Sequence, residues 1–314
     1  MHSVSILIPV YNYDIVALVH NLGKAVEMVP EFCEVIIGDD GSSPEHSANY
    51  QQLARAGKSV KLYHAEKNIG RASIRNRLAE EATGDFLLFI DADAMIPGTA
   101  ENYLRKWLPY IIPGRVICGG TTYPPYPPAD PDKWLRWRYG KRREERSSGE
   151  RNRHPYASFS GFNFLAEKAL FGKIRFNEEL KQYGHEDTLL GYQLKIAGIE
   201  ILHIDNPLIH DGIEPGSDFI AKTKQGVENL SFLCDKVTDK RSFAESVRLV
   251  KIYNRLSAVG ANHILTKIYI RYRERMEVKL ASEKGSILLF GLFKMSLFAT
   301  YRAIHKRRAV LTTT

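Results

Sequence analysis

The feature that most constrains the fold is a run of five apolar residues that ends in two aspartates. Residues 86–90, FLLFI, are followed by Asp91 and Asp93. A continuous apolar run bounded by glycine and proline is typical of a strand that is buried on both faces of a sheet. Carboxylates at its end are costly to bury unless a cation or a hydrogen-bond donor meets them. Because open α/β sheets bind ligands beyond the carboxyl ends of their strands, we expect a ligand over these two acids.

Predicted strands and helices alternate through the N-terminal half of the chain. Their order predicts an α/β fold, Rossmann-like, with a mostly parallel sheet and helices on both faces. The predicted strands cover residues 4–10, 34–40, 60–64 and 86–90, and the predicted helices cover 14–29, a segment that starts at Pro44, and about 72–83. Two more strands are predicted near 116–120 and 199–204.

The composition changes after residue 120. Residues 122–131 contain five prolines, which favour extended or turning backbone. We therefore expect 122–157 to form a long loop or lid that is inserted in a catalytic domain of residues 1–215. From 216 to 314 the pattern predicts a basic helical region.

The net charge of +8 is distributed unevenly. Residues 236–314 contain 17 Lys and Arg against 5 Asp and Glu, and residues 133–153 contain 9 against 3. Apolar runs between 286 and 298 are interrupted by Lys294 and fall short of the roughly 20 residues that span a bilayer. This basic pattern fits a helix on an anionic membrane surface, a helical appendage packed on the catalytic domain, or a self-association surface.

The cysteines and the N-terminus bear on location. Cys33, Cys118 and Cys234 are widely scattered and match neither a disulfide framework nor a metal motif, which favours a reducing compartment. The first residues lack the basic segment and the small-residue cleavage site of a secretory signal. We expect a cytoplasmic protein, and contact with the cytoplasmic face of a membrane through residues 236–314 is one of the three alternatives given above.

Five short motifs together resemble one enzyme family. The segments SILIPVYN, GDDGSS, NIGRASIRN, GDFLLFIDAD and GHED occur in the order and spacing of family 2 glycosyltransferases, over about residues 3–215. Each motif alone is weak, because acid pairs and glycine turns are common, but five in order are specific. The resemblance implies a GT-A fold and the transfer of a sugar from a nucleotide donor to a hydroxyl. It further implies a glycan or lipid-linked acceptor and a role in surface polysaccharide assembly.

The resemblance assigns metal binding to the DxD motif and to one histidine. Asp93 is the expected ligand of Mn²⁺ or Mg²⁺, and Asp91 is expected to contact the ribose or to support the metal ligands. Carboxylate oxygens suit such cations when they bridge a diphosphate. In some relatives a histidine at the position of His210 completes the site and favours Mn²⁺, although a structural role for His210 is equally open. Without a metal, the two aspartates would serve as a helix cap and a solvated acid.

The nucleotide is expected to lie against the ends of the first two strands. Asp40 resembles the acid that accepts a hydrogen bond from N3–H of uracil, and Tyr11 can stack on the base or close the pocket edge. Pro9 fixes the turn that exposes these groups. Asp39 is expected to cap the following helix or to contact the ribose.

A glycine and two arginines follow in the next motif. Gly70 allows close approach of the backbone to a ligand at a helix N-terminus, where negative charge is favoured. Arg71 and Arg75 lie four residues apart on one helical face and can point toward the donor. A solvated surface pair would have the same spacing.

The GHED motif is the expected catalytic segment. An inverting transfer needs one carboxylate that deprotonates the acceptor hydroxyl, and the resemblance assigns this role to Asp187, with Glu186 as the second candidate or an acceptor contact. Both acids could instead only stabilise the first turn of a helix. Phe162 and Phe164 stand where the family usually has small or polar residues beside the sugar pocket.

Three other functions fit parts of the sequence less well. Aromatic and basic residues in 133–153 suggest nucleic-acid binding, but no such motif is present and the acidic catalytic part would repel a polyanion, so we expect no nucleic-acid partner. A nucleotidyltransferase would need a glycine-rich basic loop near residue 10, where this chain has IPVYN. A nucleotide-sugar-binding protein without activity would not need both Asp93 and Asp187. The donor, the acceptor and a divalent cation are therefore the expected partners.

Overall fold

The computed structural model describes residues 2–180 and 184–312, with side chains up to residue 305. The chain divides into two compact units. The first, here the sheet unit, comprises Met1–Pro124, Glu144–Lys181 and Glu186–Gly212. The second, here the helical unit, comprises Pro125–Arg143, Gln182–His185 and Ile213–Thr314.

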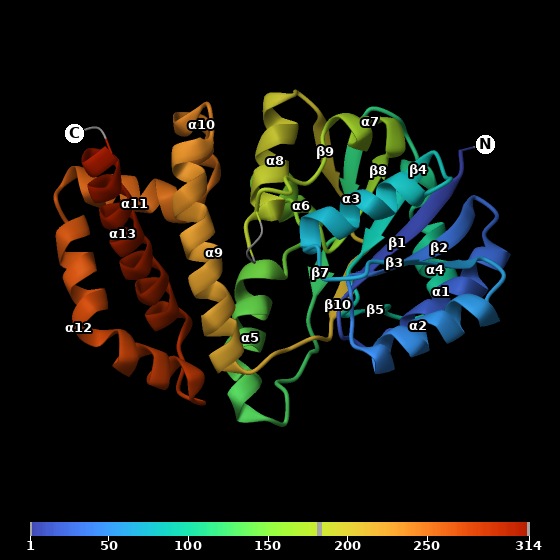
Figure 1. Ribbon diagram of the computed structural model, residues 1–314, viewed down its shortest axis with the longest axis horizontal. Helices are drawn as coiled ribbons and strands as arrows, with labels where there is room; N and C mark the ends of the chain where they lie inside the picture. The colour runs from blue at the N-terminus through green and yellow to red at the C-terminus, as the bar shows by residue number, and fades with distance from the viewer. Residues whose placement is uncertain (1, 181–183, 313–314) are drawn as a thin grey trace. The chain divides into compact units, whose positions relative to one another are not determined.

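The sheet unit is built on a seven-stranded sheet with the order β3-β2-β1-β4-β8-β6-β9 (Figure 1). Its strands are β1 (Val4–Val10), β2 (Phe32–Asp39), β3 (Val60–His64), β4 (Phe86–Ile90), β6 (Arg115–Cys118), β8 (Asn163–Glu167) and β9 (Glu200–His203). Strand β8 runs antiparallel to both β4 and β6, and the other neighbouring strands are parallel. The predicted α/β fold with a mostly parallel sheet is confirmed. A small second sheet, β5-β10-β7, pairs Ala94–Met95, Leu208–His210 and Thr121–Thr122.

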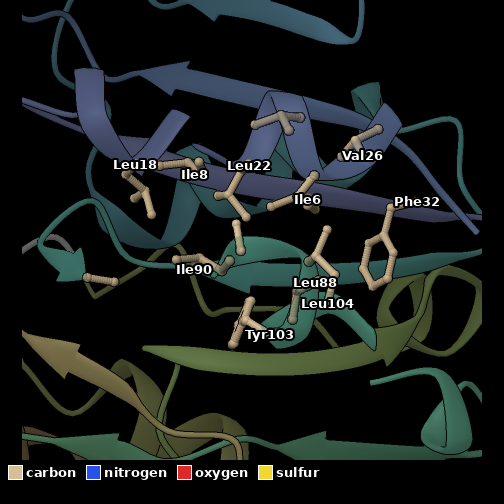
Figure 2. Packing of buried hydrophobic residues seen from close by; sticks show 14 of the residues in the cluster. Ile6, Ile8, Leu18, Leu22, Val26, Phe32, Leu88, Ile90, Tyr103 and Leu104 are labelled. Carbon is tan, nitrogen blue, oxygen red and sulfur yellow. The ribbon is translucent and has the colours of Figure 1, made fainter. Parts of the chain in front are cut away.

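Alternate side chains of the central strands bury on opposite faces of the sheet, as expected for strands covered on both sides. Ile6, Ile8 and Leu88 pack with α1 (Val16–Met28) and α4 (Ala100–Arg105), as Figure 2 shows. Leu7 and Phe89 belong to the core of the other face. That second core also takes in residues of α3 (Arg71–Glu81), α7 (Lys168–Lys173) and α8 (Glu186–Ile196). Helix α2 (Pro44–Ala56) contributes Tyr50 to the first core.

The segment 122–157 differs from the long loop that the prolines suggested. It contains several short helices: η2 (Pro131–Lys133), α5 (Trp134–Tyr139), η3 (Gly140–Glu144), α6 (Ser148–Asn152) and η4 (Tyr156–Ser158). Arg151 is buried and donates to the backbone oxygens of Cys118, Gly119 and Ile204. This arginine therefore holds the sheet unit together and is not a solvated lid residue.

The helical unit consists mainly of α9 (Gly216–Lys236), α10 (Lys240–Ser246), α11 (Arg248–Ala258), α12 (Asn262–Ala281) and α13 (Ile287–Thr312). Residues 287–305 form one helical segment that is long and apolar enough to cross a membrane by length and composition, contrary to the shorter run expected from the sequence. The core helix of a soluble protein passes the same test. Here Phe290, Phe293 and Phe298 are buried in the unit, which makes α13 its central helix.

Candidate active site

The carboxyl ends of β1, β2 and β4 bring most of the predicted donor residues to one edge of the sheet. Strand β1 lies between β2 and β4, and Val10 is in register with Asp39. Pro9 lies in β1 opposite Gly38, and Tyr11 follows β1 with 52% of its surface exposed. Tyr11 is therefore available to stack on a planar ligand.

Asp39 is fully buried and is used by the protein itself. Its Oδ1 accepts a hydrogen bond from the backbone N–H of Ser42 at 2.8 Å, and its Oδ2 accepts from the Ser47 hydroxyl and lies 2.8 Å from Nδ1 of His64. These donors hold the pKa of Asp39 below its usual range against the opposing effect of burial. The carboxylate ties the turn after β2 to the Ser47 side chain of helix α2, whose N-cap residue is Ser43.

Asp40 faces the loop that precedes α3. Its two oxygens accept hydrogen bonds from the backbone N–H groups of Ile69, at 2.7 Å, and Gly70, at 3.1 Å. Gly70 has a φ of +94°, which side-chain-bearing residues rarely adopt, so the glycine lets this loop reach the carboxylate. Burial raises the pKa of Asp40. Each oxygen has a second lone pair, which leaves capacity for a ligand N–H.

Asp91 is held by the two predicted arginines of α3. Nη2 of Arg75 lies 2.5 Å from Oδ1 of Asp91, and Nη2 of Arg71 lies 3.2 Å from Oδ2. Arg75 is buried, with its guanidinium over the ring of Phe176, whereas Arg71 is half exposed and also lies 3.9 Å from Glu186. The two arginines are not a solvated surface pair, because they join Asp91 to the start of α8.

Asp93 lies opposite His210, which comes from the distant strand β10. Oδ2 of Asp93 is 3.5 Å from Nε2 of His210, and the backbone N–H of Asp211 donates to the backbone oxygen of Asp93 at 2.9 Å. A Cβ on Gly212 would lie 2.7 Å from Oδ2 of Asp93, so a glycine is required for this approach. The side chain of Asp93 remains 30% exposed.

The imidazole of His210 is sandwiched between two aromatic rings. The rings of Tyr123 and Phe162 each lie with their centroids 5.4 Å from that of His210, at interplanar angles of 14° and 12°. The Tyr123 hydroxyl donates to Glu144, and the backbone N–H of Asp91 donates to the backbone oxygen of Phe162. This three-ring stack fixes the plane of the imidazole beside Asp93.

Asp187, the predicted base, lies in the first turn of α8. The backbone N–H of Gly161 donates to its Oδ2 at 2.9 Å, and a Cβ on Gly161 would lie 2.7 Å from its Oδ1. Burial raises the pKa of Asp187 to about 6, with a further rise from Glu186 and Asp91 and an opposing effect of Arg75. A carboxylate with such a pKa can accept a proton near neutral pH. Glu186 is buried and faces Arg71.

Asp93 and His210 could supply two of the ligands of a divalent cation. Across residues 2–180 and 184–312, no group of three or more His, Cys, Asp or Glu side chains could by itself hold a metal ion. Two ligands at right angles around Mg²⁺ lie about 3 Å apart, close to the 3.5 Å between Asp93 and His210. Such cations commonly take their other ligands from phosphate and water oxygens, so one carboxylate and one imidazole suit a metal that is shared with a diphosphate.

Several residues of this site were not predicted from the sequence. Tyr13 lies close to the acids, since burial together with Asp93 and Asp211 raises its pKa to about 12. Gly161 and Gly212 matter because they lack a Cβ, and their only sequence signal is a glycine within SGF and HDG. Tyr123 lies within the proline-rich residues 122–131, and the loop expected there gave no reason to place its side chain in the site.

Comparison with known proteins gives the family. The sequence model of the family described as Glycosyl transferase family 2 matches residues 5–171. An uncharacterized glycosyltransferase of Haemophilus influenzae is 30% identical over 123 residues, which cover 39% of this chain and 48% of that protein. The match thus spans about half the length of this relative.

Solved structures share the fold. The mannosyltransferase PcManGT of Pyrobaculum calidifontis, in complex with GDP-Man and Mn²⁺, superposes with a TM-score of 0.56 at 13% identity, covering 96% of this chain and 86% of that one. TarS 1-349 of S. aureus, in complex with UDP-GlcNAc, gives a TM-score of 0.54 at 15% identity, covering 97% and 92%. Both likenesses support the GT-A fold. With the family match over more than half of the chain, they lead to one conclusion: this protein belongs to glycosyltransferase family 2.

Proposed function

We propose that this chain is a metal-dependent, inverting glycosyltransferase that moves one sugar from a UDP-linked donor to a hydroxyl of a glycan or lipid-linked acceptor. The observation that carries the proposal is the asymmetry among the acids of the site. Asp39 and Asp91 are occupied by protein donors, whereas Asp93 is partly exposed beside His210 and Asp187 has a raised pKa. One carboxylate is thus available for a cation and another for a proton.

The donor is expected to lie over the ends of β1 and β2. Asp40 can accept the N3–H of uracil with the lone pairs that its two backbone donors leave, and the exposed ring of Tyr11 can cover the base. The solved structure of TarS contains UDP-GlcNAc, and that of PcManGT contains GDP-Man and Mn²⁺. Uracil offers one N–H donor between two carbonyl groups, and one oxygen of Asp40 can accept it.

The diphosphate is expected to face Asp93 and His210. A divalent cation, when bound there, would neutralise the charge that develops on the departing nucleoside diphosphate. Arg71 is half exposed and lies beside Asp91, so its guanidinium can also meet a phosphate oxygen. An Asp and a His as ligands favour Mn²⁺ over Mg²⁺, because imidazole suits the softer ion.

Asp187 is the proposed base that activates the acceptor hydroxyl. Its carboxylate takes the proton of the acceptor hydroxyl while that oxygen bonds to the anomeric carbon. The bond between the anomeric carbon and the phosphate oxygen breaks, and the electron pair leaves with the nucleoside diphosphate. Because a single displacement occurs from the face opposite the leaving group, the configuration of the anomeric carbon inverts. Gly161 orients the carboxylate through its N–H.

We further propose a cytoplasmic enzyme that works in surface polysaccharide assembly, in peripheral contact with a membrane through residues 236–314. The support is the net charge of this segment, with 17 Lys and Arg against 5 Asp and Glu. A lipid-linked acceptor would be presented at such a surface.

The test is a donor panel. The protein is incubated with UDP-sugars and GDP-sugars in the presence of Mn²⁺, Mg²⁺ or EDTA, and release of the nucleoside diphosphate is measured. We expect release from one UDP-sugar with Mn²⁺ and none with EDTA. Binding without release, even with added glycan acceptors, would indicate a nucleotide-sugar-binding protein. Release that is unaffected by EDTA would contradict the metal dependence.

A further inference from the structure

The helical unit exposes apolar side chains on α12 as well as on α13, whose phenylalanine residues are buried. The apolar residues Phe290, Phe293, Leu297 and Phe298 of α13 are buried inside the unit. Helix α13 packs along α12 and α9, and the rings of Phe290 and Phe219 lie 5.0 Å apart. Crossing a membrane would require α13 to leave this core. The apolar run that suggested membrane contact is therefore covered by the protein in part, while Leu288 and Leu292 remain 87% and 40% exposed.

Helix α12 instead exposes one continuous face. Ile264, Ile270 and Val278 are 62%, 68% and 74% exposed. Five residues of α12 follow one another at spacings of three or four: Ile264, Lys267, Arg271, Arg275 and Val278. This spacing places them in one line along the helix, and all five are exposed. We call this line, with Ile270 beside it, the α12 face.

The charge of this helix is strongly positive. Residues 262–281 contain five Lys and Arg against two Glu. One of the acids, Glu277, pairs with Lys224 of α9 at 2.7 Å, and the other, Glu274, lies 3.7 Å from its neighbour Arg273. The basic residues of the α12 face thus meet solvent between exposed apolar side chains.

We propose that the α12 face is the surface on which this protein docks to an anionic lipid bilayer. Exposed Ile and Val at both ends can enter the boundary between headgroups and acyl chains, while Lys267, Arg271 and Arg275 meet the anionic headgroups. A helix that lies in the plane of the interface needs this combination of one apolar-basic face and a packed opposite face. Leu265, Met276 and Leu280 form that packed face. This inference deepens the membrane contact proposed above and rests on the proposed function only for the placement of the acceptor.

The experiment is co-sedimentation of the full chain with vesicles of phosphatidylcholine alone and of phosphatidylcholine with phosphatidylglycerol. The test variant is Lys267→Gln/Arg271→Gln/Arg275→Gln. The matched control, Lys24→Gln/Lys58→Gln/Lys106→Gln, removes three exposed lysines of the sheet unit and changes the net charge equally. A third variant, Ile264→Ser/Val278→Ser, removes apolar surface and no charge.

We expect binding to the anionic vesicles only. Each basic residue near an anionic surface contributes roughly a fivefold change in partitioning, so the test variant should bind on the order of 100-fold more weakly and the control should change little. The serine variant should also bind more weakly. Circular dichroism and UDP titration, which need no lipid, show whether each variant is folded and keeps its donor site.

Three results would overturn the inference. They are absence of wild-type binding to anionic vesicles, an equal loss in test and control variants, and a change of oligomeric state in the test variant without a change in vesicle binding. The last would make the α12 face a contact between copies of this chain. Loss of UDP binding in the wild type would contradict the proposed function and would leave the vesicle result standing.

Discussion

The acid pairs that follow β2 and β4 look alike in the sequence but have different surroundings. At the end of β2, Asp39 and Asp40 are met by neutral donors, namely backbone N–H groups and a serine hydroxyl, together with His64. At the end of β4, Asp91 is met by two guanidinium groups, and Asp93 faces an imidazole at 3.5 Å.

The difference shows how one motif can serve two purposes. Neutral donors add no charge, and the pair after β2 holds the following turn and the loop before α3 in place. Guanidinium groups offset the charge of Asp91 and, through Arg75, also lower the pKa of Asp187. The two arginines therefore couple the end of β4 electrostatically to the start of α8.

The largest effect on activity is expected at Asp187, the proposed base. Asp187→Asn keeps the size of the side chain but removes the proton acceptor. A positioned general base contributes about 10²–10⁴-fold, so turnover should fall by that factor. The binding constant for the donor should stay unchanged, because Asp187 faces the acceptor in our proposal. Steady-state kinetics with a calorimetric titration of donor measures both, and an active Asp187→Asn variant would remove this residue from its role.

Removal of Arg75, which interacts with both Asp91 and Asp187, should have the next largest effect. Arg75→Met leaves Asp91 without its closest partner, and removal of one member of a buried ion pair costs about 3–5 kcal/mol. Chemical denaturation should show a loss near the lower value, since Asp91 keeps Arg71.

The same variant should shift the pH dependence of activity. In the wild type, kcat/KM should rise tenfold per pH unit below about 6 and level off above, because Asp187 must be ionised to accept a proton. Arg75 lowers this pKa, so in Arg75→Met the rise should move to higher pH. An unchanged profile would show that the titrating group is not Asp187.

A smaller effect, on the free energy of unfolding, should distinguish Asp39 from Asp93. Asp39 accepts hydrogen bonds from the protein, whereas Asp93 is partly exposed. Asp39→Ala leaves the N–H of Ser42 and the hydroxyl of Ser47 without their acceptor, which costs about 1–3 kcal/mol. Asp93→Ala should change the free energy of unfolding by no more than about 0.5 kcal/mol, as is usual for partly exposed positions. Thermal and chemical denaturation of both variants measures the contrast, and equal losses would contradict it.

The sequence predicted the parts of this molecule that depend on local pattern. The apolar runs at 4–10 and 86–90 are buried on both faces, and the acids at the ends of β2 and β4 lie at one edge of the sheet. Contacts between distant segments were not predictable in this way. The stack of Tyr123, His210 and Phe162 joins residues from three separate parts of the chain.

Burial of charged and apolar residues was harder to predict than strand position. Arg151 lies in the segment for which a loop or lid was expected, and its buried guanidinium donates to backbone oxygens of Cys118 and Ile204. The apolar residues of α13 fitted either a membrane surface or packing on the protein, and in the structure Phe290, Phe293 and Phe298 lie in the core of the helical unit. In both cases the partner that decides the outcome lies far away in the sequence.

The most direct test of the account is a calorimetric titration of UDP into the protein with and without Mn²⁺, for the wild type and for Asp93→Ala. If Asp93 is the acid that remains available for a metal-bound diphosphate, the wild type should bind UDP more tightly with Mn²⁺. Asp93→Ala should remain folded and lose the whole of that gain. Equal Mn²⁺-dependent binding by both proteins would contradict the central claim and would place the metal, or its function, elsewhere.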